Sequence, residues 1–172
     1  MRNLRQAVIL GTITLPFLFL VACNLLPSQV TSGEKQLIKS PAPDKFTIVR
    51  LDYSNTPLNH LLKSEVQKAK AQGGRPYLEF YADWCPASNA LGKNLGDKLM
   101  VDAFTGTYII QLNLDEWKSE LTDVGFVVHE IPMFFELDAE GKPTGRKISG
   151  GAWGENIPEN MAPPLKEFFH TK

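Results

Sequence analysis

From residue 46 onward, apolar residues recur at two spacings. Short runs of strand length alternate with stretches in which every third or fourth residue is apolar, and this predicts strands and helices in alternation. A polar turn at 138–142 is typical of a hairpin, and its Gly141 suits a positive φ. Apolar runs of strand length and composition occur before and after this turn. The predicted strands are 46–51, 76–81, 108–114, 133–137 and 146–149.

The first predicted helix lies between the first two strands. Its apolar residues recur at helical spacing from Leu58 to Ala69. Asn55 or Thr56 is expected to be its N-cap, and the glycine pair that begins at Gly73 is expected to end it. The first three elements are therefore strand, helix and strand.

A second helix is expected after Cys85. Gly92 and Gly96 should kink or interrupt it, because glycine inside a helix costs about 1 kcal/mol relative to alanine. A short helix is predicted over 115–124, and a closing helix packs three apolar residues on the sheet: Leu165, Phe168 and Phe169. The order β, α, β, α, β, α, β, β, α indicates an α/β fold with parallel crossovers, a hairpin and a final helix.

Residues 1–22 have the pattern of a bacterial export signal. A basic start and an apolar stretch from Ala7 to Leu20 end in Leu-Val-Ala-Cys at Cys23. This ending resembles the lipobox of bacterial lipoproteins, which implies a signal peptide of residues 1–22 and acylation (palmitate) on the sulfur of Cys23. The alternative is an uncleaved membrane helix, but the stretch is short for a span of about 20 residues and contains Pro16.

The domain boundaries follow from composition. Residues 23–44 hold the acylated cysteine and a tether rich in Ser, Pro and Thr, and 45–172 form a single folded domain. Asn24 follows the cysteine, which in bacteria resembling the enterobacteria favours sorting to the outer membrane. The expected location is the cell envelope, with a lipid anchor in the outer membrane and the domain facing the periplasm.

Charge and spacing argue against several function classes. Removing residues 1–22 leaves 16 Lys and Arg against 19 Asp and Glu, a net charge of −3 without a basic stripe, so nucleic-acid binding is not expected. The three histidines, at 60, 129 and 170, are far apart, and no Cys or His pair has metal-ligand spacing. No phosphate loop or dinucleotide fingerprint is present, so neither a metal nor a cofactor is expected.

Cys85 lies where a strand ends and a helix begins, in the run Tyr-Ala-Asp-Trp-Cys-Pro-Ala-Ser at 81–88. Three residues on, Ser88 replaces the second cysteine of a Cys-x-x-Cys pair, whose second thiolate resolves mixed disulfides. A single thiol forms a mixed disulfide but does not release it alone. With Cys23 acylated, Cys85 is an unpaired thiol in an oxidising compartment, which predicts intermolecular pairing or a reactive thiol.

The run Glu-Phe-Tyr-Ala-Asp-Trp-Cys at 79–85 resembles the active-site approach of the thioredoxin superfamily. It is most similar to the C-terminal periplasmic domain of DsbD-type thiol:disulfide interchange proteins. The Ile131-Pro132 pair before an apolar strand, the Glu-Gly-Lys turn at 140–142 and the glycine pair at 150–151 resemble the second half of the family. The resemblance covers roughly residues 45–170 and implies a single thioredoxin-like domain, with a central mixed sheet flanked by helices.

The resemblance also implies roles for particular residues. Cys85 is the expected nucleophile, stabilised as a thiolate by the helix N-terminus. Glu79 is the expected buried carboxylate that exchanges protons, with a pKa raised by desolvation. The role of Ser88 follows from spacing instead: at i+3 it lies on the same helix face as Cys85, and its hydroxyl is suited to donate to the thiolate. Pro132 matches the family's cis-proline beside the sulfur, and four residues are expected to bind the partner's chain: Trp84, Pro86, Ile131 and Pro132.

Two functions remain open at this point. The first is a membrane-tethered monothiol protein that forms mixed disulfides with cysteine-containing envelope proteins, in reduction or isomerisation. The second is a redox-inactive binding or assembly module, favoured by Ser88 and by Met133, where the best-known members carry threonine. In plainer interpretations Cys85 is an inert packed thiol, Glu79 a solvated edge residue and Pro132 an ordinary trans proline.

Overall fold

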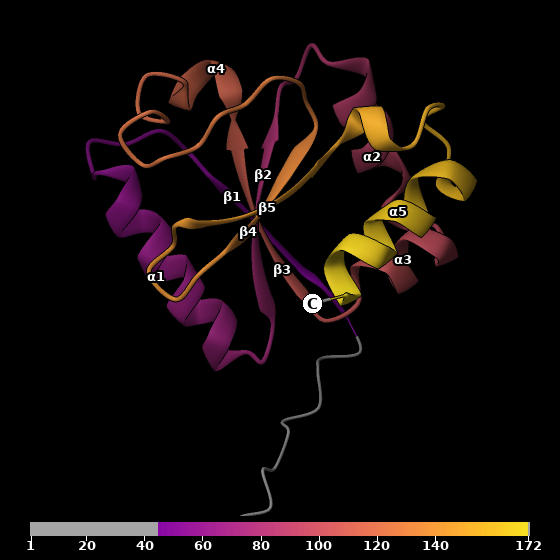
Figure 1. Ribbon diagram of the computed structural model, residues 1–172, viewed down its shortest axis with the longest axis horizontal. Coiled ribbons are helices and arrows are strands. Elements are labelled where there is room, and N and C mark those ends of the chain that lie inside the picture. Colours follow the sequence, from indigo (N-terminus) through magenta and orange to yellow (C-terminus); the bar gives the residue numbers. More distant parts are fainter. Residues whose placement is uncertain (1–44, 172) are drawn as a thin grey trace, which may run out of the picture. The chain divides into compact units, whose positions relative to one another are not determined.

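A computed structural model describes residues 45–171 (Figure 1). Its centre is a five-stranded mixed sheet with the strand order β1-β3-β2-β4-β5. The strands are β1 (Thr47–Leu51), β2 (Arg75–Tyr81), β3 (Thr107–Asn113), β4 (Met133–Leu137) and β5 (Pro143–Ser149). All five predicted strands are present, and their bounds differ from the predicted ranges by a few residues at the ends.

The first three strands are parallel, and the last two form the predicted hairpin. β3 pairs in parallel with β1 and β2, whereas β4 pairs antiparallel with both β2 and β5. The ends of β1, β2 and β3 and the start of β4 therefore lie at one edge of the sheet, which we call the carboxyl edge. Side chains in the loops of this edge meet although they are far apart in the sequence.

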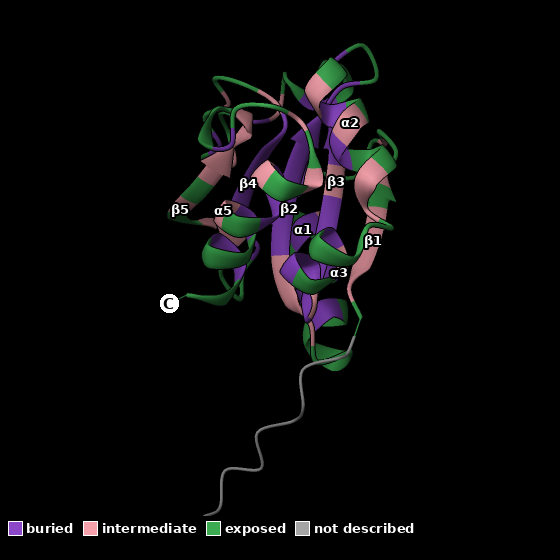
Figure 2. Ribbon diagram, turned by 90° about the vertical axis from the view of Figure 1, so that its right-hand side faces the viewer, coloured by how far each residue is buried: buried purple, intermediate pink, exposed green. Residues whose placement is uncertain are grey.

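Helices cover both faces of the sheet, and the three central strands, β2, β3 and β4, are largely buried (Figure 2). The helices are α1 (Leu58–Ala71), α2 (Pro86–Asn94), α3 (Lys98–Phe104), α4 (Leu114–Trp117), the one-turn 3₁₀ helix η1 (Gly150–Ala152) and α5 (Pro158–His170). Side chains of α1 and α4 share one hydrophobic core with the sheet, and those of α2, α3 and α5 share the other. The predicted closing helix is confirmed, and Leu165, Phe168 and Phe169 are buried in the second core.

The expected N-cap of the first helix is wrong. Pro57 occupies the cap position, and neither Asn55 nor Thr56 accepts a hydrogen bond from the helix. Instead, the backbone N–H of Leu58 donates to Oε2 of Glu120 at 3.2 Å. The proline at the cap position has no side-chain acceptor, so a carboxylate from a distant segment satisfies one of the open donors of the first turn.

The other helix predictions were met in part. The expected interruption after Gly92 is confirmed, because α2 ends at Asn94 and α3 begins at Lys98. The helix predicted over 115–124 ends already at Trp117, which is buried and donates its indole N–H to the carbonyl of Leu51. Turns follow, and they rather than a helix carry the next apolar side chains into the core.

Gly141 in the hairpin turn is packed directly on α1. Its φ is +80°, and a Cβ there would lie 2.9 Å from backbone atoms of Leu62 and Lys63. Gly141→Ala should therefore lower the unfolding free energy by about 2 kcal/mol or more, measured by urea denaturation. Gly145, with φ +97° and no atom within 4 Å of such a Cβ, is the matched control for backbone strain alone. Equal losses in both alanine variants would contradict the predicted clash.

The signal peptide of residues 1–22, the acylated Cys23 and the tether to residue 44 lie outside the described residues and stay predictions. Within 45–171, no helix is long and apolar enough to cross a membrane.

Candidate active site

Cys85 occupies the carboxyl edge, four residues after β2 ends. It is the N-cap residue of α2, and the backbone N–H of Ser88 donates to its Sγ at 3.5 Å. Pro86 is in the first turn of the helix, where its missing N–H leaves no donor unsatisfied. An N–H group directed at the sulfur from a helix start favours the negatively charged form of that sulfur.

The Ile131–Pro132 peptide bond is cis, as predicted, and it lies beside Cys85. The thiol donates to the carbonyl oxygen of Ile131 at 3.4 Å. Behind the proline, the N–H of Gly150 donates to the carbonyl of Pro132 at 3.0 Å, which ties this loop to the end of β5. The fold therefore brings together two motifs that are 46 residues apart in the sequence.

Burial differs sharply between Cys85 and its neighbour. Only 6% of Cys85 is exposed, whereas 66% of Trp84 is exposed. The indole N–H of Trp84 donates to Oδ2 of Asp115 at 2.7 Å, which holds this large aromatic ring at the surface. A partner reaching the sulfur would thus meet an aromatic side chain of fixed position next to it.

Glu79 lies in β2, which is the central strand between β3 and β4. The interpretation of Glu79 as a solvated residue at the margin of the sheet is therefore wrong. It is 1% exposed, and its Oε2 accepts a hydrogen bond from Nε2 of Gln111 at 2.8 Å. Burial raises the pKa of Glu79 to about 7, although the Gln111 hydrogen bond and the charge of Arg50 both act to lower it. A carboxyl with this pKa exchanges protons readily near neutral pH.

Sequence reasoning missed Gln111 and Arg50. The sheet register aligns Arg50 of β1 with Gln111 of β3, and Gln111 with Glu79 of β2. The signal for Gln111 was present, because it interrupts the otherwise buried run of β3. Arg50 also lies over the Tyr81 ring, 4.4 Å from its centroid, and nothing in the sequence indicates that contact.

Ser88 is buried, but its hydroxyl does not act as expected. Oγ has no hydrogen-bond partner among residues 45–171, so the predicted donation to Cys85 is absent and the backbone N–H takes that place. The residue instead lines a polar pocket of about 280 Å³ together with Glu79, Arg50 and Gln111. The pocket links the position where a second thiol would stand to the buried carboxylate.

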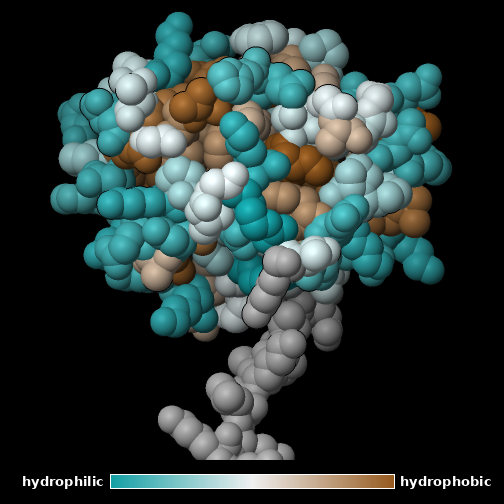
Figure 3. Space-filling view, in the orientation of Figure 1, coloured by the Kyte–Doolittle hydropathy of each residue, from teal (hydrophilic) through white to brown (hydrophobic). Residues whose placement is uncertain are grey.

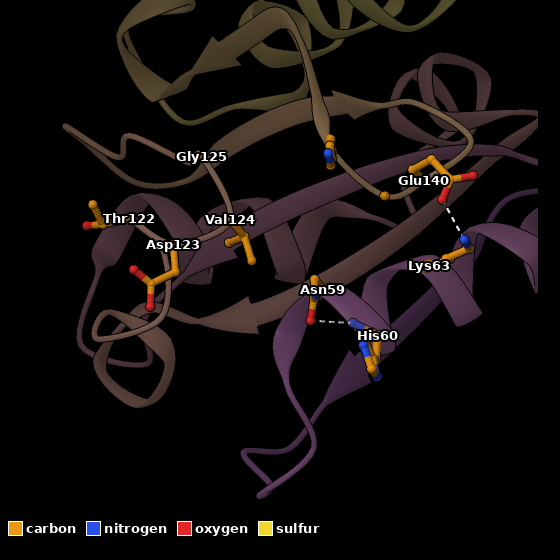
Figure 4. A pocket seen from close by; sticks show the side chains of 10 residues that line it. Asn59, His60, Lys63, Thr122, Asp123, Val124, Gly125 and Glu140 are labelled. Atoms are coloured by element: carbon orange, nitrogen blue, oxygen red, sulfur yellow. Dashed lines mark hydrogen bonds and ion pairs between the residues drawn. The ribbon is translucent and has the colours of Figure 1, made fainter.

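A separate cavity of the described domain is lined by none of the expected site residues. It has a volume of about 650 Å³ and lies between α1, the loop 122–125 and the β4–β5 turn, where Lys63 pairs with Glu140 (Figure 4). In the part of the chain that the structure describes, no three His, Cys, Asp or Glu side chains are grouped closely enough to hold a metal ion.

Known proteins share this sequence in part. No family model matches the chain. The rice protein "Thioredoxin-like protein HCF164, chloroplastic" is 31% identical over 107 residues, which are 60% of this chain and 40% of the relative. A second relative is the "Thiol:disulfide interchange protein TxlA" of Synechococcus elongatus, 36% identical over 73 residues, which are 41% of this chain and 37% of that protein. The chain has a thioredoxin-like fold and is similar in sequence to these proteins.

This thioredoxin-like chain matches less than half of the length of these two relatives. Among solved structures, a disulphide isomerase from Xylella fastidiosa Temecula1 is 18% identical, with a TM-score of 0.47, and the match covers 69% of this chain and 94% of that one. That likeness is too weak to add to the argument. The expected thioredoxin-like fold is confirmed by the sheet topology and by the sequence relatives.

The buried carboxylate predicts a pH-dependent stability. A glutamate carboxyl in water has a pKa of 4.5, and burial raises the pKa of Glu79 to about 7 in the folded protein. Between these values the folded protein keeps a proton that the unfolded chain loses, so the unfolding free energy falls as pH rises through this window. The loss should total about 3 kcal/mol. It is absent below the window and complete above it.

Glu79→Gln should remove this component, because an amide does not titrate. Urea denaturation from about pH 4 to about pH 8 should show the variant gaining about 3 kcal/mol relative to the wild type. Glu116→Gln, at an exposed position, is the matched control and should track the wild type. Parallel pH curves for the wild type and Glu79→Gln would show that Glu79 is not the group responsible.

Proposed function

We propose that this protein is a membrane-tethered monothiol thioredoxin-like protein that exchanges disulfides with proteins of the bacterial envelope. The contact geometry of Cys85 carries the proposal. Its sulfur lies between the N–H of Ser88 and the carbonyl of Ile131, where a helix start meets the cis-proline loop. The relatives support the same chemistry, since one of them is named a thiol:disulfide interchange protein.

The exchange has two steps. The Cys85 thiolate attacks one sulfur of a partner's disulfide, the partner's S–S bond breaks, and the departing sulfur leaves as a thiolate that takes up a proton. This forms a mixed disulfide. A thiol from outside then attacks the partner's sulfur in that bond and frees Cys85, because residue 88 has no sulfur of its own. If the outside thiol belongs to a protein dithiol, its second thiol then displaces the partner, so the dithiol is oxidised and the partner's disulfide is reduced. If another thiol of the partner itself attacks instead, Cys85 is released as a thiolate and the partner's disulfide is isomerised.

Glu79 supports these steps by holding a proton. It lines the polar pocket beside Ser88, and burial raises its pKa to about 7, so both protonation states are populated near neutral pH. Its proposed role is to take the proton that the Cys85 thiol loses and to return it when Cys85 is released. Trp84, Pro86, Ile131 and Pro132 surround the sulfur as the contact surface for the partner's chain.

The cellular setting of the proposal comes from the sequence. The lipobox pattern at Cys23 supports a lipid anchor, and Asn24 supports the outer membrane with the domain in the periplasm. The run Tyr-Ala-Asp-Trp-Cys at 81–85 supports a relation to DsbD-type proteins. Partners are then envelope proteins with free or disulfide-bonded cysteines, in a compartment where an unpaired thiol meets oxidised protein.

Trapping of mixed disulfides tests the proposal. Membranes are isolated from cells after acid quenching and thiol blocking, then separated on non-reducing gels and analysed by mass spectrometry. Discrete adducts should appear in the wild type and disappear in a Cys85→Ala strain, because an adduct without a resolving thiol is long-lived. A free monomer, under conditions in which another envelope thiol protein is trapped, would contradict the proposal.

The second candidate is a binding module without redox chemistry. The low exposure of Cys85 favours it, as does Met133, which is buried directly after the cis-proline. The alkylation rate of Cys85 measured against pH separates the candidates. A thiol that titrates clearly below the ordinary pKa of about 8.5 supports exchange, and a thiol that titrates there supports binding alone.

A further inference from the structure

An apolar groove continues the contact surface around Cys85. It has a volume of about 420 Å³, and its apolar lining comes from Leu114, Leu121, Phe126, Val127 and Val128. Asp115, Lys118 and Thr122 also line it. Asp115 accepts from the Trp84 indole, so the groove adjoins the exposed aromatic ring next to the sulfur. Val127 is itself 56% exposed, and hydrophobic surface is visible near α4 in the upper left of Figure 3. A chain bound at Cys85 and passing Trp84 would reach this groove.

The loops around this surface carry an unbalanced charge. Four segments join the elements at the carboxyl edge: 52–57, 82–85, 114–132 and 150–157. Together they hold eight Asp and Glu residues but a single Lys, Lys118, and no Arg. The chain as a whole is nearly neutral, with 18 Lys and Arg against 19 Asp and Glu. Negative charge is therefore concentrated on the edge that bears the sulfur.

This charge is not neutralised within the domain. The four ion pairs among residues 45–171 are Lys63–Glu140, Lys68–Glu65, Arg146–Glu136 and Lys166–Asp102. None includes a carboxylate of the four edge segments. The acidic side chains that are exposed there include Asp83, Asp115, Glu116, Glu130 and Glu155.

Among these acidic residues, Glu130 is the one next in sequence to a residue that contacts the Cys85 sulfur. It immediately precedes Ile131, whose carbonyl accepts from the Cys85 thiol. Its carboxylate accepts from the Ser149 hydroxyl, and a Cβ on Gly151 would lie 3.1 Å from one of its oxygens. The Ser149 hydroxyl and the neighbouring backbone hold the carboxylate beside the cis-proline loop and the end of β5.

We propose that the carboxyl edge selects partner segments in which the reacting cysteine has Lys or Arg beside it and an aliphatic side chain nearby. This inference rests on the proposed exchange function and names the partner class of the same site. The aliphatic side chain occupies the groove beside Trp84, and the basic residues face Glu130, Asp115 and Glu116. Charge complementarity of this kind raises association rates and disfavours acidic partners.

Exchange rates with synthetic peptides test the inference. The full chain carries Cys23→Ser, so that Cys85 is its sole thiol. Each peptide contains Leu and one cysteine, joined by a disulfide to thionitrobenzoate, with Lys, Gln or Glu beside the cysteine. Cys85 attacks the peptide sulfur, the new S–S bond forms, and coloured thionitrobenzoate leaves with the electron pair.

The Lys peptide should react about tenfold faster than the Glu peptide at low salt, with the Gln peptide between them. The ratio should shrink at high salt, because the Debye length falls to about 3 Å at 1 M. Replacing the Leu with Ser should slow all three peptides if the groove takes the aliphatic side chain. Equal rates for the three peptides, or a faster Glu peptide, would overturn the charge selection.

Two variants separate this inference from the function itself. Glu116→Gln with Glu130→Gln should reduce the Lys-to-Glu ratio while the Gln peptide still reacts. Glu167→Gln removes an exposed acidic charge near the end of α5 and should leave the ratio unchanged. If even the Gln peptide reacts no faster with the wild type than with Cys85→Ala, the exchange function fails. If it reacts but the ratio is one, only the selection fails.

Discussion

Under the proposed exchange function, Ser88→Cys is expected to convert a protein that holds its partners in long-lived mixed disulfides into a turnover catalyst of disulfide reduction. Position 88 is one helical turn after Cys85, and its backbone N–H is already 3.5 Å from the Cys85 sulfur. Its Oγ is buried, without a partner in the described domain, and lines the pocket that holds Glu79. A sulfur there would have a proton acceptor in the same pocket.

The second thiol acts within the chain and needs no encounter with an outside thiol. Well-oriented intramolecular groups have effective concentrations far above those of free thiols, so the mixed disulfide should be released at least about a hundredfold faster. The measurement is reduction of a protein disulfide with dithiothreitol as the electron source, on a Cys23→Ser background. In cells, the trapped adducts should become scarce.

Ser88→Ala is the control for the loss of the hydroxyl. It should behave as the wild type, because the backbone N–H that reaches the Cys85 sulfur is retained. An adduct that lives as long in Ser88→Cys as in Ser88→Ala, with both thiols open to alkylation, would show that the two positions are not arranged for exchange.

Cys85→Ala should reduce disulfide exchange to the level of a blank without protein. Cys23 and Cys85 are the only cysteines, so on the Cys23→Ser background no nucleophilic sulfur remains. The fold should persist, because the variant removes one sulfur whose hydrogen bonds are long, and a typical substitution costs about 1 kcal/mol. The measurement pairs the exchange rate with an unfolding curve of the same sample.

Cys85→Ala also separates covalent adducts from non-covalent partner binding. Under the exchange function, Cys85→Ala loses covalent adducts completely, while weak binding through Trp84 and the groove remains. Residual thionitrobenzoate release above the blank, in a variant shown to be folded, would mean that another group does the chemistry.

The sequence predicted the parts of the site that depend on local signals. The strand-to-helix junction at Cys85 was readable from a few neighbouring residues. The cis bond before Pro132 and the buried carboxylate at Glu79 were implied by the resemblance to the superfamily, which rests on short motifs around them. Strand order then brought them together, as the resemblance to the superfamily implied. The burial of Glu79 follows from the central place of β2 in the sheet, which one strand's composition does not reveal.

The side-chain contacts of Cys85 and Glu79 were not predictable from local sequence signals. The hydroxyl of Ser88 was the expected donor to the sulfur, but the helix geometry gives that place to the backbone N–H and leaves the hydroxyl without a partner among residues 45–171. Arg50 and Gln111 reach Glu79 through the sheet register. The turns after Trp117 likewise have no local signal, because residues 118–124 contain no glycine or proline that would end a helix.

The hydrogen bond from Leu58 to Glu120 makes two distant parts of the domain cooperative. The donor and acceptor are 62 residues apart, and Glu120 belongs to the segment that also forms the apolar groove. The first turn of α1 is therefore completed only when the segment after α4 is in place. Local opening of either part should expose backbone amides of both, so amide hydrogen exchange should report α1's start and the groove as one unit.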